Sequence, residues 1–156
     1  MSSQALLEPA PPLSTARTVA RAGLGAMLLF TGISHLTFAR REFIAQVPKS
    51  LPLSDDTVVL ASGVAELLIG ASLIALPRHR VPIGLGTAAF FIAIFPGNVA
   101  QYLNGVDAFG LDTDGKRFVR LFFQPLLVAW ALLSTGSWEW LRDRMKASPA
   151  ESGESR

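Results

Sequence analysis

The sequence contains no cysteine. Disulfide bonds, thiol redox relays and cysteine-ligated zinc or iron–sulfur sites are therefore excluded for this chain. Any redox role would have to use a bound cofactor or a partner protein. Charge is also scarce, since 17% of the 156 residues are Asp, Glu, Lys or Arg, against about 25% in a typical soluble domain. The deficit is concentrated in four long apolar stretches, which indicates a membrane protein.

The net charge of +2 does not indicate nucleic-acid binding. The basic residues stand beside the apolar stretches, where lipid headgroups and membrane topology account for them. The expected surroundings are a lipid bilayer, with no nucleic-acid partner.

Four apolar stretches are long enough to be membrane spans, because a helix needs about 20 apolar residues to cross the hydrocarbon core of a bilayer. They lie at about residues 18–38, 57–76, 82–102 and 118–135. None alternates with a period of two over its length, so strands of a membrane barrel are not expected. The sequence predicts an all-α fold, a four-helix membrane domain over residues 16–140.

The segments outside the spans differ in character. Residues 1–15 are rich in Pro, Ser and Ala and are predicted to form a disordered cytoplasmic tail, and residues 141–156 a basic and then disordered one. The apolar run of the first span is too long for a signal peptide, so an uncleaved anchor is expected. In the connection at residues 39–56, Phe43, Ile44 and Val47 share one helical face, which predicts a short interfacial helix before Pro48.

Topology follows from the distribution of Lys and Arg, because cytoplasmic loops carry an excess of them. Seven of these residues fall on the side of the two termini and five on the other side. Both termini are therefore predicted to be cytoplasmic, in a bacterial cytoplasmic (inner) membrane.

Glu66 lies near the middle of the second span, where an unpaired carboxylate would cost roughly 2.5–3.5 kcal/mol. It must therefore be protonated, paired or solvated in a cavity. With both termini inside, several polar side chains fall in the outer half of the bundle. They predict one intramembrane polar pocket, formed by His35, Glu66, Asn98, Gln101, Arg120 and Gln124.

Two interpretations of this pocket remain open. In the structural one, which the residues alone favour, Glu66 and Arg120 form an ion pair, and Asn98 and Gln124 complete its hydrogen bonds. In the other, the same groups form a ligand or proton site. No metal site is expected, because one His and one Glu on separate helices fall short of a di-metal carboxylate bundle.

Five segments occur in an order and spacing that resemble the DoxX-like family of four-helix membrane proteins. They are Thr31–His35, Val47–Pro52, Ser62–Gly70, Phe95–Asn98 and Arg120–Gln124. The resemblance covers about residues 20–136, and it places the family's polar signature on His35, Glu66, Asn98, Arg120 and Gln124. It implies that these side chains share an inward-facing pocket.

The resemblance also implies two kinds of function. Some relatives are small membrane subunits of quinone-linked sulfur oxidation or of oxidative-stress complexes, and distant animal relatives are membrane chaperones. Thiol chemistry does not carry over, because this chain lacks cysteine.

Three functions are compatible with the sequence, which shows no catalytic motif. The first is an accessory or assembly component of a membrane complex, with a membrane-protein partner. The second is a quinone-binding subunit of a membrane oxidoreductase, in which His35, Glu66 and Arg120 bind the quinone head. The third is a small proton-coupled transporter that titrates Glu66, and the absence of an internal repeat disfavours it. Whether the chain forms a homo-oligomer stays open.

Overall fold

The computed structural model describes residues 12–49 and 51–151, with side chains as far as residue 146. The described chain is helical and contains no strand. Four of its helices are long and apolar enough to cross a membrane, which confirms the predicted all-α, four-span architecture. They are α1 (Thr15–Leu36), α3 (Asp55–Ala75), α4 (Arg80–Leu103) and α5 (Asp114–Thr135).

Three shorter elements connect or follow the long helices. The short helix expected between the first two spans is α2 (Arg40–Ile44), and a 3₁₀ turn, η2 (Pro77–His79), precedes α4. The last helix is α6 (Ser137–Glu151). Several helices begin before their apolar residues do, because a polar residue caps them. For example, Thr113 accepts the N–H of Lys116 and starts α5 ahead of the predicted position 118.

Helix α6 occupies much of the segment that was expected to be a C-terminal tail. Gly136, with a φ of 78°, ends α5 in the left-handed conformation. Ser137 then donates a hydrogen bond of 3.0 Å to the carbonyl of Val81 on α4, and Glu139 forms an ion pair with Arg17 on α1. These contacts attach the first turn of α6 to the bundle. Residues 1–11 and 152–156, where both tails were also expected, lie outside the described residues.

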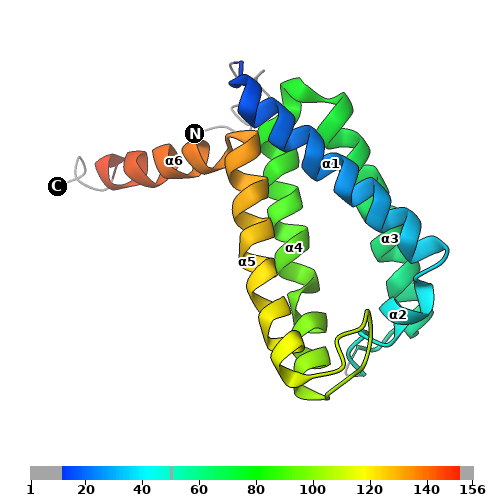
Figure 1. Cartoon of the computed structure of the whole chain (residues 1–156). Helices are drawn as coiled ribbons and strands as arrows, with labels where there is room; N and C mark the ends of the chain where they lie inside the picture. The colour runs from blue at the N-terminus through cyan, green and yellow to red at the C-terminus, as the bar shows by residue number, and fades with distance from the viewer. Residues whose placement is uncertain (1–11, 50, 152–156) are drawn as a thin grey trace.

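The four long helices form two pairs, α1 with α3 and α4 with α5 (Figure 1). The pairs meet where α1 begins and α6 departs, and they diverge toward α2 and the connection at residues 104–113. We call these two regions the α6 end and the α2 end. The apolar core lies nearer the α6 end and consists of Leu24, Leu28, Leu73, Ala88, Phe91 and Ala131. Space for a site is therefore left at the α2 end.

Glycines bring α1 and α3 into backbone contact. A Cβ atom added at Gly70 would lie 2.7 Å from the carbonyl oxygen of Gly25, and one added at Gly25 would lie 2.8 Å from that of Gly70. Nearer the α2 end of the same crossing, a Cβ atom added at Gly63 of α3 would lie 2.8 Å from the Cβ of His35 on α1. This close crossing sets the register between α1 and α3, and with it the position of His35 beside Glu66.

The attachment of α6 is expected to weaken in acid. Partial burial acts to raise the pKa of Glu139, but the hydrogen bond and charge of Arg17 outweigh it and hold that pKa below its ordinary value of 4.5. A carboxylate with a lowered pKa stabilises the folded state above its unfolded pKa, and this contribution is lost as the pH falls through the folded pKa.

Both partners are about one-third exposed, so the effect should stay below about 1 kcal/mol. We expect amide exchange in α6 to accelerate as the pH falls below about 4.5, after correction for the intrinsic exchange rate. Glu139→Gln should remove this pH dependence. An unchanged pH profile in that variant would show that other groups hold the helix.

Candidate functional site

A cavity of about 760 Å³ lies between the two helix pairs, with walls from α1, α3, α4 and α5 and from the segment around α2. Its lining is mostly apolar. Five of the six predicted pocket residues line it: His35, Glu66, Asn98, Arg120 and Gln124. The sixth, Gln101, is buried outside the lining. The cavity therefore brings together side chains from four helices that are far apart in the sequence.

The first polar wall is formed by His35 on α1 and Glu66 on α3, which are 6% and 5% exposed. The Nδ1 atom of His35 lies 3.2 Å from Glu66 Oε2 and 2.9 Å from the carbonyl oxygen of Thr31. A carbonyl can only accept, so Nδ1 carries the proton and donates a hydrogen bond to the Thr31 carbonyl oxygen. Glu66 Oε2 is within ion-pair range but accepts no hydrogen bond from any described residue. A buried oxygen of this kind is available for a donor on a ligand.

The second polar wall belongs to α4 and α5. Arg120 Nε donates to Asn98 Oδ1 over 3.2 Å, and Asn98 Nδ2 donates to Gln124 Oε1 over 2.9 Å. Gln124 Nε2 in turn donates to the carbonyl of Phe91 within α4. Asn98 thus positions Arg120, and Gln124 in turn positions Asn98.

Gln46, which was not among the pocket residues predicted from the sequence, joins the segment after α2 to the second wall. It follows α2, and its Oε1 accepts from Arg120 over 3.3 Å while its Nε2 donates to Gln101 Oε1 over 2.9 Å. Gln101 then donates to the carbonyl of Val106 over 3.3 Å. A signal was present, because Gln46 stands three residues after Phe43 and therefore shares its helical face. Gln46 lies in the connection between two spans, however, where a polar residue carries no membrane-insertion cost that would mark it.

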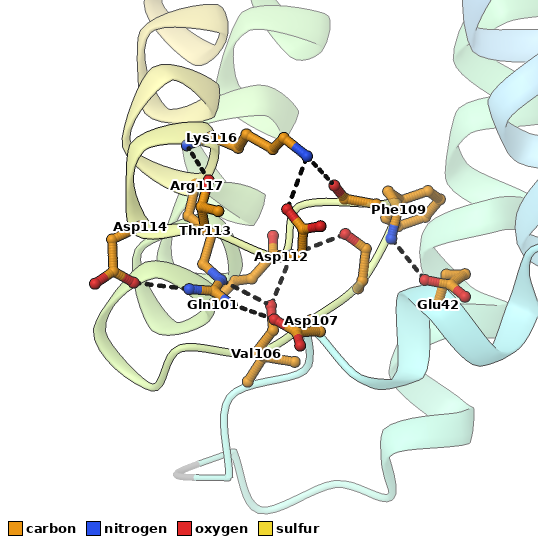
Figure 2. A network of polar contacts seen from close by, with 12 residues as sticks. Glu42, Gln101, Val106, Asp107, Phe109, Asp112, Thr113, Asp114, Lys116 and Arg117 are labelled. Atoms are coloured by element: carbon orange, nitrogen blue, oxygen red, sulfur yellow. Dashed lines mark hydrogen bonds and ion pairs between the residues drawn. The ribbon is translucent and has the colours of Figure 1, made fainter.

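Phe109 is a second residue that the sequence did not reveal. Its φ of 56° is uncommon for a residue with a side chain. Its N–H donates to Glu42 Oε2 over 2.6 Å (Figure 2), and its ring meets that of Phe43 edge-on, with 4.7 Å between the centroids. The guanidinium of Arg120 lies 5.4 Å from the centre of the same ring. Phe109 thus ties the connection at residues 104–113 to α2 and covers Arg120.

Arg117 fixes the other side of that connection. It is 6% exposed, forms ion pairs with Asp107 and, over 2.7 Å, with Asp114, and donates to the carbonyl of Val106 over 3.2 Å (Figure 2). The connection at residues 104–113 is therefore attached to α2 through Phe109 and to α5 through Arg117.

The expected ion pair between Glu66 and Arg120 is not present. Glu66 lies beside His35, and no carboxylate in the described part of the chain lies within 4.0 Å of the Arg120 guanidinium. The physical reason is the divergence of the helix pairs, which places the two charges on opposite walls, with Gln46 reaching Arg120 in place of Glu66. The side chains described here also include no group of three or more His, Cys, Asp or Glu that could hold a metal ion.

Comparison with known proteins gives one match. The model of a family described as a domain of unknown function (DUF8561) matches residues 24–135. No curated protein and no solved structure matches the chain. The matched segment includes every residue that lines the cavity.

Proposed function

Because the chain belongs to the DUF8561 family, for which no function is given, we propose its role from the geometry of the cavity. It is an integral membrane protein that holds one amphipathic small molecule between its two helix pairs, as an accessory subunit of a larger membrane complex. The observation that carries the proposal is the cavity itself, with an unsatisfied Glu66 oxygen on one wall and the Arg120 guanidinium on the other.

A quinone fits this description best. Binding sites for such molecules are mostly apolar, with a few polar groups that orient the head. A quinone carbonyl can accept from Arg120, whereas a quinol hydroxyl can donate to Glu66 Oε2. The apolar tail would lie along the lining of α3 and α4, which includes Val59, Ile94 and Leu103.

The accessory role follows from what the chain cannot supply. A quinone exchanges electrons, and a chain without cysteine has no thiol or cysteine-ligated cluster to deliver them. A redox partner in the membrane is therefore required. The resemblance to DoxX-like proteins supports the same reading and remains a proposal, as does the location in a bacterial inner membrane with both termini cytoplasmic.

One observation favours a second candidate, an assembly factor that binds no small molecule. Asn98, Gln124, Gln46 and Gln101 already hydrogen-bond to one another or to backbone carbonyls. A polar network whose groups are already hydrogen-bonded needs no ligand, and it is compatible with a purely structural role in the bundle. Proton-coupled transport by Glu66 has no comparable observation in its favour.

Native mass spectrometry of the protein, extracted from its own membrane in mild detergent, tests the proposal. We expect one bound molecule of quinone mass per chain, and about tenfold less of it in Glu66→Gln. A hydrogen bond to a charged acceptor is worth about 1.5–3 kcal/mol, and tenfold corresponds to about 1.4 kcal/mol.

Asp143→Asn is the matched control, because this carboxylate is 69% exposed and does not line the cavity. Its quinone content should equal that of the wild type. A protein that carries no quinone, but arrives with a larger membrane protein whether or not Glu66 is replaced, would contradict the ligand-binding role and support the assembly factor.

A further inference from the structure

A second hollow, of about 570 Å³, borders the polar network on a different side. It lies along α5 from Gly115 to Leu127, and Phe109 and Leu111 of the preceding connection also line it. It shares Asn98, Arg120, Gln124 and Leu127 with the large cavity, but Lys116 lines only this hollow and Glu66 lines only the cavity. The two spaces can therefore be tested separately.

The charged residues in the lining of the hollow are both basic. Lys116 and Arg120 are four residues apart, hence on the same face of α5, and its lining includes no Asp or Glu. Lys116 donates to the carbonyl of Gly110 and, over 2.7 Å, to exposed Asp112 outside the lining. That hydrogen bond and the lysine charge hold the pKa of Asp112 below its ordinary value.

Arg120 lacks even that compensation. Its partners in the described chain are the neutral oxygens of Asn98 and Gln46 and the ring of Phe109. A guanidinium cannot lose its proton at physiological pH, and a charge within a span is expensive unless it is paired. An anion from outside the chain is the partner that the geometry leaves room for.

The rest of the hollow is apolar and runs along the helix. Val119, Phe123 and Leu127 recur at every fourth position of α5, and all three line the hollow. Val119 is 55% and Phe123 58% exposed, so the stripe is open to the surroundings. Cations near the end of a span, followed by an apolar stripe toward its middle, reproduce the order of headgroup and acyl chain in one leaflet.

We propose that this hollow binds an anionic phospholipid, with its phosphate at Lys116 and Arg120 and one acyl chain along Val119, Phe123 and Leu127. The site is complementary to this occupant in charge and in polarity. Arg120 and Leu127 line both spaces, so Lys116, which does not line the large cavity, is the residue that distinguishes this proposal from ligand binding there.

The test uses the full chain in detergent, titrated with dioleoyl phosphatidylglycerol or with dioleoyl phosphatidylcholine, and scored by native mass spectrometry and thermal stability. We expect the anionic lipid to bind and to raise the unfolding temperature more than the neutral one. One lysine near an anionic headgroup is worth about 1 kcal/mol, so Lys116→Gln should weaken binding of phosphatidylglycerol about fivefold.

Lys49→Gln is the matched control, because this lysine is also exposed and also paired with an aspartate, Asp55, yet it lines neither space. It should leave the affinity unchanged. The proposal is overturned if phosphatidylcholine binds equally well, if Lys49→Gln weakens binding as much as Lys116→Gln does, or if inorganic phosphate alone displaces the lipid.

Substitutions at Lys116 and at Glu66 test the two proposed sites separately. Lys116→Gln should leave the quinone content of the large cavity unchanged, and Glu66→Gln should leave the affinity for phosphatidylglycerol unchanged. Loss of lipid selectivity with quinone retained would remove only the second site, and loss of quinone with lipid selectivity retained would remove only the first.

Discussion

Gly70→Ala is expected to destabilise the protein by about 1–3 kcal/mol, the usual range for overpacking a tight contact. The added Cβ would lie 2.7 Å from the carbonyl oxygen of Gly25 and 3.0 Å from the backbone nitrogen of Leu29. Both are backbone atoms, so they cannot turn aside as a flexible side chain could. The helices α1 and α3 would have to move apart, and equilibrium unfolding in detergent with a chemical denaturant measures the loss.

Gly86→Ala provides the control for this substitution. Gly86 also lies within a long helix, α4, but nothing stands within 4 Å of the position that its Cβ would take. Alanine loses less backbone entropy than glycine in a helix, so this variant should be neutral or up to about 1 kcal/mol more stable. Equal stability of the two variants would show that α1 and α3 are not in backbone contact.

The separation of α1 and α3 should also reach the cavity. His35 and Glu66 face each other only because the two helices cross closely, as the 2.8 Å between a Cβ at Gly63 and the Cβ of His35 shows. We therefore expect Gly70→Ala to lower both the quinone content and the stability. Gly86→Ala should lower neither.

His35 and Glu66 are expected to be energetically coupled, and Glu66 and Arg120 are not. His35 Nδ1 lies 3.2 Å from Glu66 Oε2, so removing either residue takes away the polar neighbour of a buried group, and residues in such contact do not contribute additively to stability. The singles His35→Leu and Glu66→Leu should therefore cost more, summed, than the double variant, with a coupling free energy between about 0.5 and 3 kcal/mol. Denaturant unfolding of the four proteins gives this value.

The matched cycle replaces Glu66 and Arg120 by leucine. These residues lie on opposite walls, and Arg120 contacts Asn98, Gln46 and Phe109 instead. Their effects should add to within about 0.5 kcal/mol. Strong coupling in this cycle, with none between His35 and Glu66, would restore the direct ion pair and contradict the observed arrangement.

The polar residues of the spans could be identified from the sequence because each is costly in an apolar segment. Glu66 and Arg120 were identified on this ground without any structure, and both line the cavity. The interpretation that the sequence favoured paired these two residues with each other, whereas the structure places Glu66 beside His35. Residues outside the spans carry no such cost in sequence, which is why Gln46 and Phe109 were missed although both contact Arg120.

The segment after α5 shows a similar division. Its composition gave no reason to expect a helix beyond residue 140, yet α6 continues to Glu151. Its first turn is held by Arg17 and by the carbonyl of Val81, which lie 122 and 56 residues away in the chain. Contacts over such separations leave no local pattern.

The sequence by itself therefore determined that the chain is all-α, that four helices can span a membrane, and which polar side chains lie within them. Hydropathy and helix length decide these features, and both are local properties of the chain. Only the tertiary structure decided that Glu66 lies beside His35, that Arg120 lies apart from it without a carboxylate, and that two spaces border one polar network. These depend on the crossing of α1 with α3 at Gly25 and Gly70 and on the divergence of the two helix pairs, which arise from packing between distant segments.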